Sequence, residues 1–257
     1  MPHEAHKPVK AVLTTNKIIE TLDELEGARV VEIAERVDRS QSVVHNHLST
    51  LRELEYVVKS GKEYQLTLRF LGLGERVRHR IPLYEAAHPE VQKLAQQTGE
   101  LITLLVEEHG QGIYLDIGQG SKDIQYPAIP GVRTHLHCSA VGKVILAHLS
   151  EEERETILQT HGLPEQTPQT ITDRDSLDDE LEIIRDQDLA FDREEFRTGL
   201  KSVGAPITGQ NGEVLGALSI AGPANRMAVD RLEGELAAEL RQSINVIELN
   251  VNEPNVR

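Results

Sequence analysis

The 257-residue sequence predicts an α+β (α/β) fold in two parts, a helix-turn-helix with a hairpin and then one sheet with packed helices. Two observations support this prediction. From Val30 to Leu54, apolar residues recur at helical spacing, and a short hairpin pattern follows. From Leu101 onward, strand-like runs joined by glycine-rich turns alternate with helical segments.

Residues 29–54 are typical of two short helices joined by a tight turn. The apolar face of the first helix consists of Val30, Ile33, Ala34 and Val37. Asp38-Arg39-Ser40 interrupts this pattern, and either Ser40 or Asp38 can cap the next helix. The inward positions of the second helix, spaced i, i+4, i+7 and i+10, are Val44, Leu48, Leu51 and Leu54.

The opposite face of the second helix is polar and poor in acid. Its donors and acceptors are of the types that read base edges in the DNA major groove, whereas an ordinary solvated face would carry more Glu and Lys pairs. These residues are Ser42, His45, Asn46 and Ser49, flanked by Gln41 and Arg52. His45 and His47 point to different faces and form no metal pair; His45 is the better base contact, and we expect His47 to pack at the edge.

A hairpin follows the two helices. Residues 57–59 and 62–66 flank Ser60-Gly61, and glycine supplies the positive φ that tight turns need. Lys59 and Lys62 lie at its tip, where a wing meets the sugar-phosphate backbone. Helix, turn, helix and hairpin form the order of a winged helix-turn-helix, which inserts its second helix into DNA. The alternative is a generic amphipathic helix pair.

The net charge of −15, with a pI near 5.2, is unusual for a DNA-binding protein. The acid is unevenly distributed, however. Residues 1–70 hold 10 Lys and Arg against 11 Asp and Glu, and the remaining residues hold 17 against 31. This asymmetry favours a nucleic-acid domain attached to an acidic regulatory domain.

Several features bear on the compartment. The acid excess, with more Arg than Lys and one Cys, resembles proteins from high-salt cytoplasms. At molar salt the screening length is only about 3 Å, so groove contacts would matter more than phosphate contacts. A single cysteine allows no intrachain disulfide, which suits a reducing compartment. There is no secretory start and no apolar run near the ~20 residues of a membrane span, so we expect a cytoplasmic protein.

The second part begins after a helical stretch, 67–80, that ends before Pro82. A helix over 83–98 and strands in 101–108 and 112–120 come next, and a strand and loop over 122–137 follow. The remaining expected elements are helices over 140–149, 151–160 and 173–187, a hairpin of strands 200–207 and 213–221, and a final helix over 229–249.

Seven ordered motifs give this sequence a resemblance to the isocitrate lyase regulator (IclR) family of transcription factors, over nearly its whole length. They are the winged-helix pattern, YQLTLRFLGLG after the wing, Ala87-His88-Pro89, Thr98-Gly99-Glu100, HCSAVGKVILAHL (137–149), FDREEFRTGLKSVGAPI (191–207) and GEVLGALSIAGPANRM (212–227). The resemblance implies a winged helix-turn-helix at 1–68, a linker helix at 69–82 and a GAF-like effector-binding domain at 83–257.

The resemblance also implies a pocket for a small molecule, usually a carboxylate or aromatic acid. Residues matching the family's lining positions are Ala140 and Val141, through their amides, with Asp192, Ser202, Ser219 and Ala221. Amides at a helix start favour an anion, and Tyr126 and Leu136 could supply an apolar wall. Asp188, Ser202 and Ala221 depart from the family's common Gly, Cys and Ser, so the effector cannot be transferred from relatives.

The histidines, the cysteine and Gly142-Lys143 also allow three alternative interpretations: a metal site, a nucleophile and a phosphate-binding loop. His135, His137 and Cys138, with His109 or His79, could hold a metal, because alternate strand residues share a face. Cys138 beside His137 could be a nucleophile, but no third group orients the pair. Gly142-Lys143 fails as a phosphate loop because Val144 replaces the required Ser or Thr.

We therefore expect a DNA-binding regulator and not an enzyme, with no metal and no cofactor. The expected partners are a pseudo-palindromic double-stranded DNA operator, a small-molecule effector and a second copy of the chain. The resemblance implies a homodimer formed near the DNA-binding domain and linker helix, and often a homotetramer of two dimers. The alternatives are a metabolite sensor that acts mainly through protein partners, and a metal-binding regulator that uses the His135, His137 and Cys138 cluster.

Overall fold

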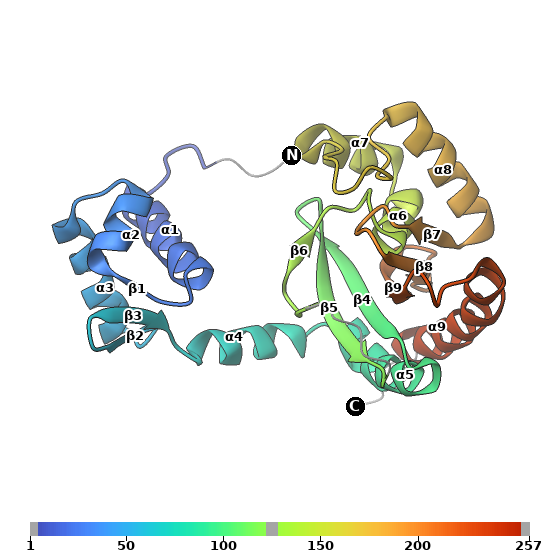
Figure 1. Cartoon of the computed structure of the whole chain (residues 1–257), viewed down its shortest axis with the longest axis horizontal. Coiled ribbons are helices and arrows are strands. Elements are labelled where there is room, and N and C mark those ends of the chain that lie inside the picture. The colour runs from blue at the N-terminus through green and yellow to red at the C-terminus, as the bar shows by residue number, and fades with distance from the viewer. Residues whose placement is uncertain (1–4, 122–127, 253–257) are drawn as a thin grey trace. The chain divides into compact units, whose positions relative to one another are not determined.

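The computed structural model describes residues 5–121 and 128–252 (Figure 1). These residues divide into two compact units, the first ending at Arg78 and the second beginning at His79.

The first unit contains the expected helix-turn-helix and wing. Its helices are α1 (Lys10–Glu24), α2 (Val30–Val37), α3 (Gln41–Glu53) and α4 (Arg69–Arg78), and its antiparallel sheet has the order β1-β3-β2, with β1 (Ala28–Arg29), β2 (Val57–Ser60) and β3 (Glu63–Leu66). Ser40 caps α3, since its Oγ accepts a hydrogen bond from the Val43 amide at 3.3 Å. Gly61, at a φ of 61°, begins the two-residue hairpin turn.

Buried apolar residues from α1, α2, α3 and the sheet form one core, including Ile18, Ile33, Val44, Leu48 and Tyr64. The prediction that Leu54 points inward is wrong. Its side chain is 51% exposed because α3 ends at Glu53 and Leu54 lies at the helix C-cap. The short strand β1 was also not predicted, because two residues give no period.

The second unit is built on a six-stranded antiparallel sheet with the order β6-β5-β4-β9-β8-β7. Its strands are β4 (Leu101–Glu108), β5 (Gln111–Gln119), β6 (Arg133–Thr134), β7 (Ala190–Arg193), β8 (Leu200–Thr208) and β9 (Val214–Pro223). Its helices are α5 (Pro82–Thr98), α6 (Ala140–His148), α7 (Glu151–His161), α8 (Arg174–Gln187), the π-helix η1 (Arg231–Leu236) and α9 (Ala237–Asn252).

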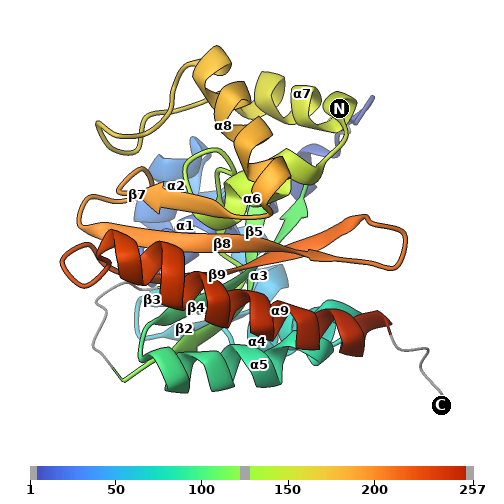
Figure 2. The same ribbon diagram turned by 90° about the vertical axis from the view of Figure 1, so that its right-hand side faces the viewer.

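Helices cover both faces of this sheet (Figure 2). Helices α5 and α9 pack on one face, over a core that includes Val91, Ile102 and Leu218. Helices α6 and α8 pack on the other, over a core that includes Leu105, Val141 and Ala217. The expected sheet with packed helices is therefore correct.

Two details of the second unit differ from the sequence expectations. Strand β7 was not predicted, because its four residues, AFDR, lie in a polar stretch and are too few to show a clear alternation. The final helix, expected over 229–249, is helical from 229 to 252 but contains a π-helical stretch directly before α9. Apolar spacing alone does not distinguish a π-helical turn from an α-helical one.

Candidate functional site

The polar face of α3 is open along its length. The eight side chains expected to meet DNA are all exposed: Gln41, Ser42, His45, Asn46, Ser49, Arg52, Lys59 and Lys62. Within residues 5–121 and 128–252, none of the eight makes a side-chain hydrogen bond or an ion pair. Their donors and acceptors are therefore available to an external partner, which is what base readout requires.

A buried tyrosine of β3 supports the wing that carries the two lysines. Tyr64 on β3 is 2% exposed, pairs with Lys59 across the hairpin, and has the Lys59 Nζ 5.3 Å from its ring centroid. The other lysine, Lys62, is in the turn itself. Both cations thus project from a hairpin that is fixed to the core of the first unit.

His47 lies at the edge of α3, as expected. Its Nδ1 is 2.8 Å from the Thr15 Oγ1 on α1, so the imidazole joins two helices. It also lines a surface groove of about 530 Å³ between α1 and α3, together with Asn46, Thr50 and Leu54. Apolar residues of α1 form the opposite wall of this groove.

A second candidate site lies on the face of the large sheet that α6 covers. Alternation along the strands and the strand register place Asp192, Ser202 and Ala221 side by side in one row of this face, on β7, β8 and β9. The adjacent row holds Gly204 and Ser219, and the register continues it to Thr103. We call this surface the pocket face.

The start of α6 lies directly over the pocket face. A Cβ at Gly204 would be 2.9 Å from the Val141 amide nitrogen and from the Ala140 carbonyl carbon, so only glycine permits this approach. Ser139 caps the helix by accepting from the Gly142 amide at 3.2 Å. The amides of Ala140 and Val141 precede the first helical hydrogen bonds and carry the positive end of the dipole.

Hydroxyl and carboxyl groups on the pocket face are buried. The hydroxyls of Thr103 and Ser219 are 2.7 Å apart, and these residues are 4% and 2% exposed. Asp192 is 1% exposed, and its Oδ2 accepts from the Ser202 hydroxyl at 3.5 Å. Burial, together with the charge of nearby Glu195, raises the pKa of Asp192 to about 7.

Leu136 and Tyr126 were the two residues predicted as an apolar wall of the pocket. Leu136 is buried among the apolar residues beneath α6. Tyr126 lies outside the described residues.

The prediction that His135 and His137 alternate along a strand is wrong, because β6 ends at Thr134 and both lie in the irregular segment that follows. Their rings are 5.7 Å apart, and the His137 Nε2 is occupied 3.1 Å from the Pro164 carbonyl oxygen. Across the described ranges, no three His, Cys, Asp or Glu side chains converge as a metal would require. Burial raises the pKa of the Cys138 thiol to about 12, which suits a buried thiol and not a nucleophile.

Comparisons with known proteins match both units. The model of the IclR helix-turn-helix domain matches residues 15–61, and that of the bacterial transcriptional regulator IclR C-terminal domain matches residues 75–248. A probable HTH-type transcriptional regulator ArcR of Halobacterium salinarum is 32% identical over 95% of this chain and 94% of its own.

The chain belongs to the IclR family. It is therefore a transcriptional regulator with a DNA-binding helix-turn-helix and a C-terminal effector domain.

Solved structures of similar IclR-family proteins cover nearly the whole chain. A putative transcriptional regulator from Rhodococcus sp. RHA1 is 26% identical with a TM-score of 0.84, over 95% of this chain and 98% of its own. An IclR homolog from Microbacterium hydrocarbonoxydans, complexed with 4-hydroxybenzoate, is 22% identical with a TM-score of 0.81, over 94% and 98%; at that identity the likeness concerns the fold. No helix among the described residues of this IclR-family protein has the length and apolarity needed to cross a membrane.

Sequence reasoning missed three features of the effector domain in this IclR protein. No local pattern marks Gly204 or Thr103 as a site residue. Their roles depend on residues far along the chain, since Gly204 faces Ala140 and Val141, and Thr103 faces Ser219. The third feature is Lys143, whose side chain is fully buried between Glu195 and Glu180. A lysine in an apolar helical run, with glutamates expected elsewhere in the domain, could have indicated such an ion pair.

Proposed function

We propose that this regulator binds a pseudo-palindromic operator as a homodimer and that a small organic acid, bound on the pocket face, controls that binding. The observation that carries the first part is the polar face of α3, where all six candidate side chains are exposed and unpaired within the described residues. In a dimer, two such helices would enter major grooves about 34 Å apart. Lys59 and Lys62 would contact the adjoining backbone.

Exposed apolar surface in the first unit supports the homodimer. No residue of α4 is buried: its Leu71 and Val77 are 59% and 60% exposed, and Leu68, just before the helix, is 82% exposed. The α1 side of the groove adds Val12, at 64% exposed. Apolar surface of this extent is costly in water, and a second copy would cover it. We further propose that two dimers pair into a tetramer, and light scattering of the full-length protein would test this by its mass.

The pocket face supports a small acid as effector. Two amides at the start of α6 favour an anion, and the Ser202, Ser219 and Asp192 side chains offer hydrogen bonds. The Microbacterium hydrocarbonoxydans structure contains 4-hydroxybenzoate, an aromatic acid. Binding would shift the regulator between a state with high and a state with low DNA affinity, by the difference in its affinity for the two.

The acid excess and the similarity to a Halobacterium salinarum protein support a role in concentrated salt, in a cytoplasm that contains the operator. Folding and operator binding should then persist at molar KCl. Loss of either as KCl rises to molar levels would contradict this part of the proposal.

A mobility-shift assay tests the central proposal. Full-length protein would be titrated into DNA from upstream of its own gene and of neighbouring genes, with and without a panel of monocarboxylic and aromatic acids. We expect a sequence-specific complex that one class of acid weakens or strengthens. Binding to no fragment of the genome, with retained binding of an acid, would instead favour a metabolite sensor that acts through protein partners.

A further inference from the structure

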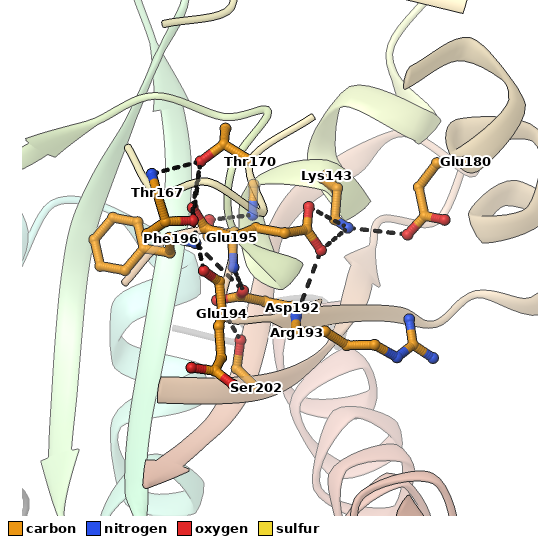
Figure 3. A network of polar contacts seen from close by, with 12 residues as sticks. Lys143, Thr167, Thr170, Glu180, Asp192, Arg193, Glu194, Glu195, Phe196 and Ser202 are labelled. Atoms are coloured by element: carbon orange, nitrogen blue, oxygen red, sulfur yellow. Dashed lines mark hydrogen bonds and ion pairs between the residues drawn. The ribbon is translucent and has the colours of Figure 1, made fainter. Parts of the chain in front are cut away.

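Residues 192–196, which we call the 192–196 turn, begin with the last two residues of β7 and continue past its end. Contacts from several sides hold this turn (Figure 3). Within the turn, the Asp192 Oδ1 accepts from the amides of Glu195 at 2.7 Å and Phe196 at 3.3 Å. Glu194 has a φ of 72°, a conformation that few residues other than glycine adopt without external support. The geometry of the 192–196 turn therefore depends on the residues packed against it.

One support comes from a loop between α7 and α8. The Thr167 hydroxyl donates to the Glu194 carbonyl at 2.7 Å, and the Thr170 hydroxyl donates to the Glu195 carbonyl at 2.6 Å. The Thr170 hydroxyl also accepts from the Thr167 amide at 2.9 Å. These contacts fix the backbone of the turn but do not restrain the Glu195 side chain.

The Glu195 side chain is restrained by Lys143 of α6. The Lys143 Nζ is 2.8 and 2.9 Å from the two Glu195 carboxylate oxygens and 2.9 Å from the Glu180 Oε1 on α8. The Glu195 Oε1 also accepts from the Arg193 amide at 3.4 Å. A single ammonium thus joins α6, α8 and the 192–196 turn (Figure 3).

Burying this ion pair costs much of the hydration free energy of both charges, so it contributes little net stability to the fold. The Lys143 side chain is 0% exposed and the Glu195 side chain 8%, so both charges have lost most of their hydration. Replacing a buried ion pair by apolar residues of similar volume is often neutral or stabilising. A geometric constraint explains the pair better, because Lys143 lies in the first turn of α6, which also contains Ala140 and Val141.

We propose that Lys143 and Glu195 are positioning residues of the effector site: their buried ion pair fixes the 192–196 turn relative to the start of α6. Asp192 is thereby held on the pocket face beside Ser202, at a constant place relative to the Ala140 and Val141 amides. Lys143 does not contact the effector itself, since its ammonium already makes three contacts with carboxylates. The inference rests on the proposed effector site.

Glu195→Gln and Glu180→Gln form a matched pair of variants, because each neutralises one carboxylate partner of Lys143. Only Glu195 belongs to the turn. Hydrogen exchange of the full-length protein, followed in the peptide spanning residues 192–199, reports on the turn without any ligand. Calorimetric titration with 4-hydroxybenzoate reports on the effector site.

We expect Glu195→Gln to accelerate exchange in this peptide and to weaken binding of the probe by about tenfold to a hundredfold, the range for losing one hydrogen bond to a charged group. Glu180→Gln should leave both properties close to those of the wild type. Equal effects of the two substitutions, or no effect of Glu195→Gln on exchange, would overturn the proposal. If 4-hydroxybenzoate does not bind the wild type, the exchange result still decides the positioning role, and only the proposed effector class has failed.

A second variant covers the case in which Glu195→Gln does not fold. Lys143→Met combined with Glu195→Met removes both charges and keeps an apolar filling of similar volume, so Tm should change little. We expect faster exchange over residues 192–199 at that retained Tm. A purely structural pair would leave the exchange of this peptide unchanged whenever Tm is retained.

Discussion

Asp192→Asn should make the pH dependence of stability less steep. The carboxyl of Asp192 is buried at the pocket face, and burial with the charge of Glu195 raises its pKa from 3.8 to about 7. The folded protein therefore keeps this proton over a range in which the unfolded chain has released it. As pH rises from about 4 to 7, this difference in proton binding lowers the free energy of unfolding. The lowered stability persists at higher pH.

The size of the effect follows from the two pKa values. Their difference corresponds to ~4 kcal/mol in total, of which ~3 kcal/mol develops between pH 5 and pH 8. Asparagine keeps an oxygen that can accept from the Glu195 and Phe196 amides but does not titrate. Between pH 5 and pH 8, the free energy of unfolding of the variant should thus rise by ~3 kcal/mol relative to that of the wild type.

Differential scanning calorimetry of the full-length proteins measures this gain. For a unit of this size, ~3 kcal/mol corresponds to about 6–12 °C in Tm. The Tm difference between Asp192→Asn and the wild type should widen by that amount between pH 5 and pH 8. Asp186→Asn, at an exposed position of α8, is the matched control and should show a constant difference. A constant difference for Asp192→Asn as well would refute the reasoning.

Three further predictions concern the two candidate sites. Asn46→Ala should reduce discrimination between operator and mismatched DNA by ~1–3 kcal/mol, measured by competition binding; unchanged discrimination would remove this side chain from base readout. Lys62→Ala should reduce the slope of log affinity against log salt by about 1 while base preference stays the same, whereas an unchanged slope would mean that the wing touches no phosphate. Gly204→Val should displace the start of α6, since a Cβ there would be 2.9 Å from the Val141 amide nitrogen. It should lower stability by ~1–3 kcal/mol and abolish binding of small acids but not of DNA; retained acid binding would contradict the placement of the pocket.

Local patterns predicted α2, α3 and the wing of the first unit, but not α1 or β1. The apolar periods of α2 and α3, the Ser40 cap and the Gly61 turn each depend on residues within a few positions of one another. The Leu54 error shows the limit of this reasoning. Periodicity continued past Glu53, but the helix did not, so the last apolar residue remained exposed.

The sequence by itself determined the helix-turn-helix and wing, the polar face of α3 and the motifs of the effector domain, because each depends on residues that are neighbours along the chain. Only the tertiary structure decided that Gly204 lies under the start of α6 and that Lys143 is buried against Glu195. Glu195 is 52 positions from Lys143 along the chain. No periodic pattern relates residues at such separations; their proximity, and with it the charge state of Asp192, depends on how the strands and helices pack.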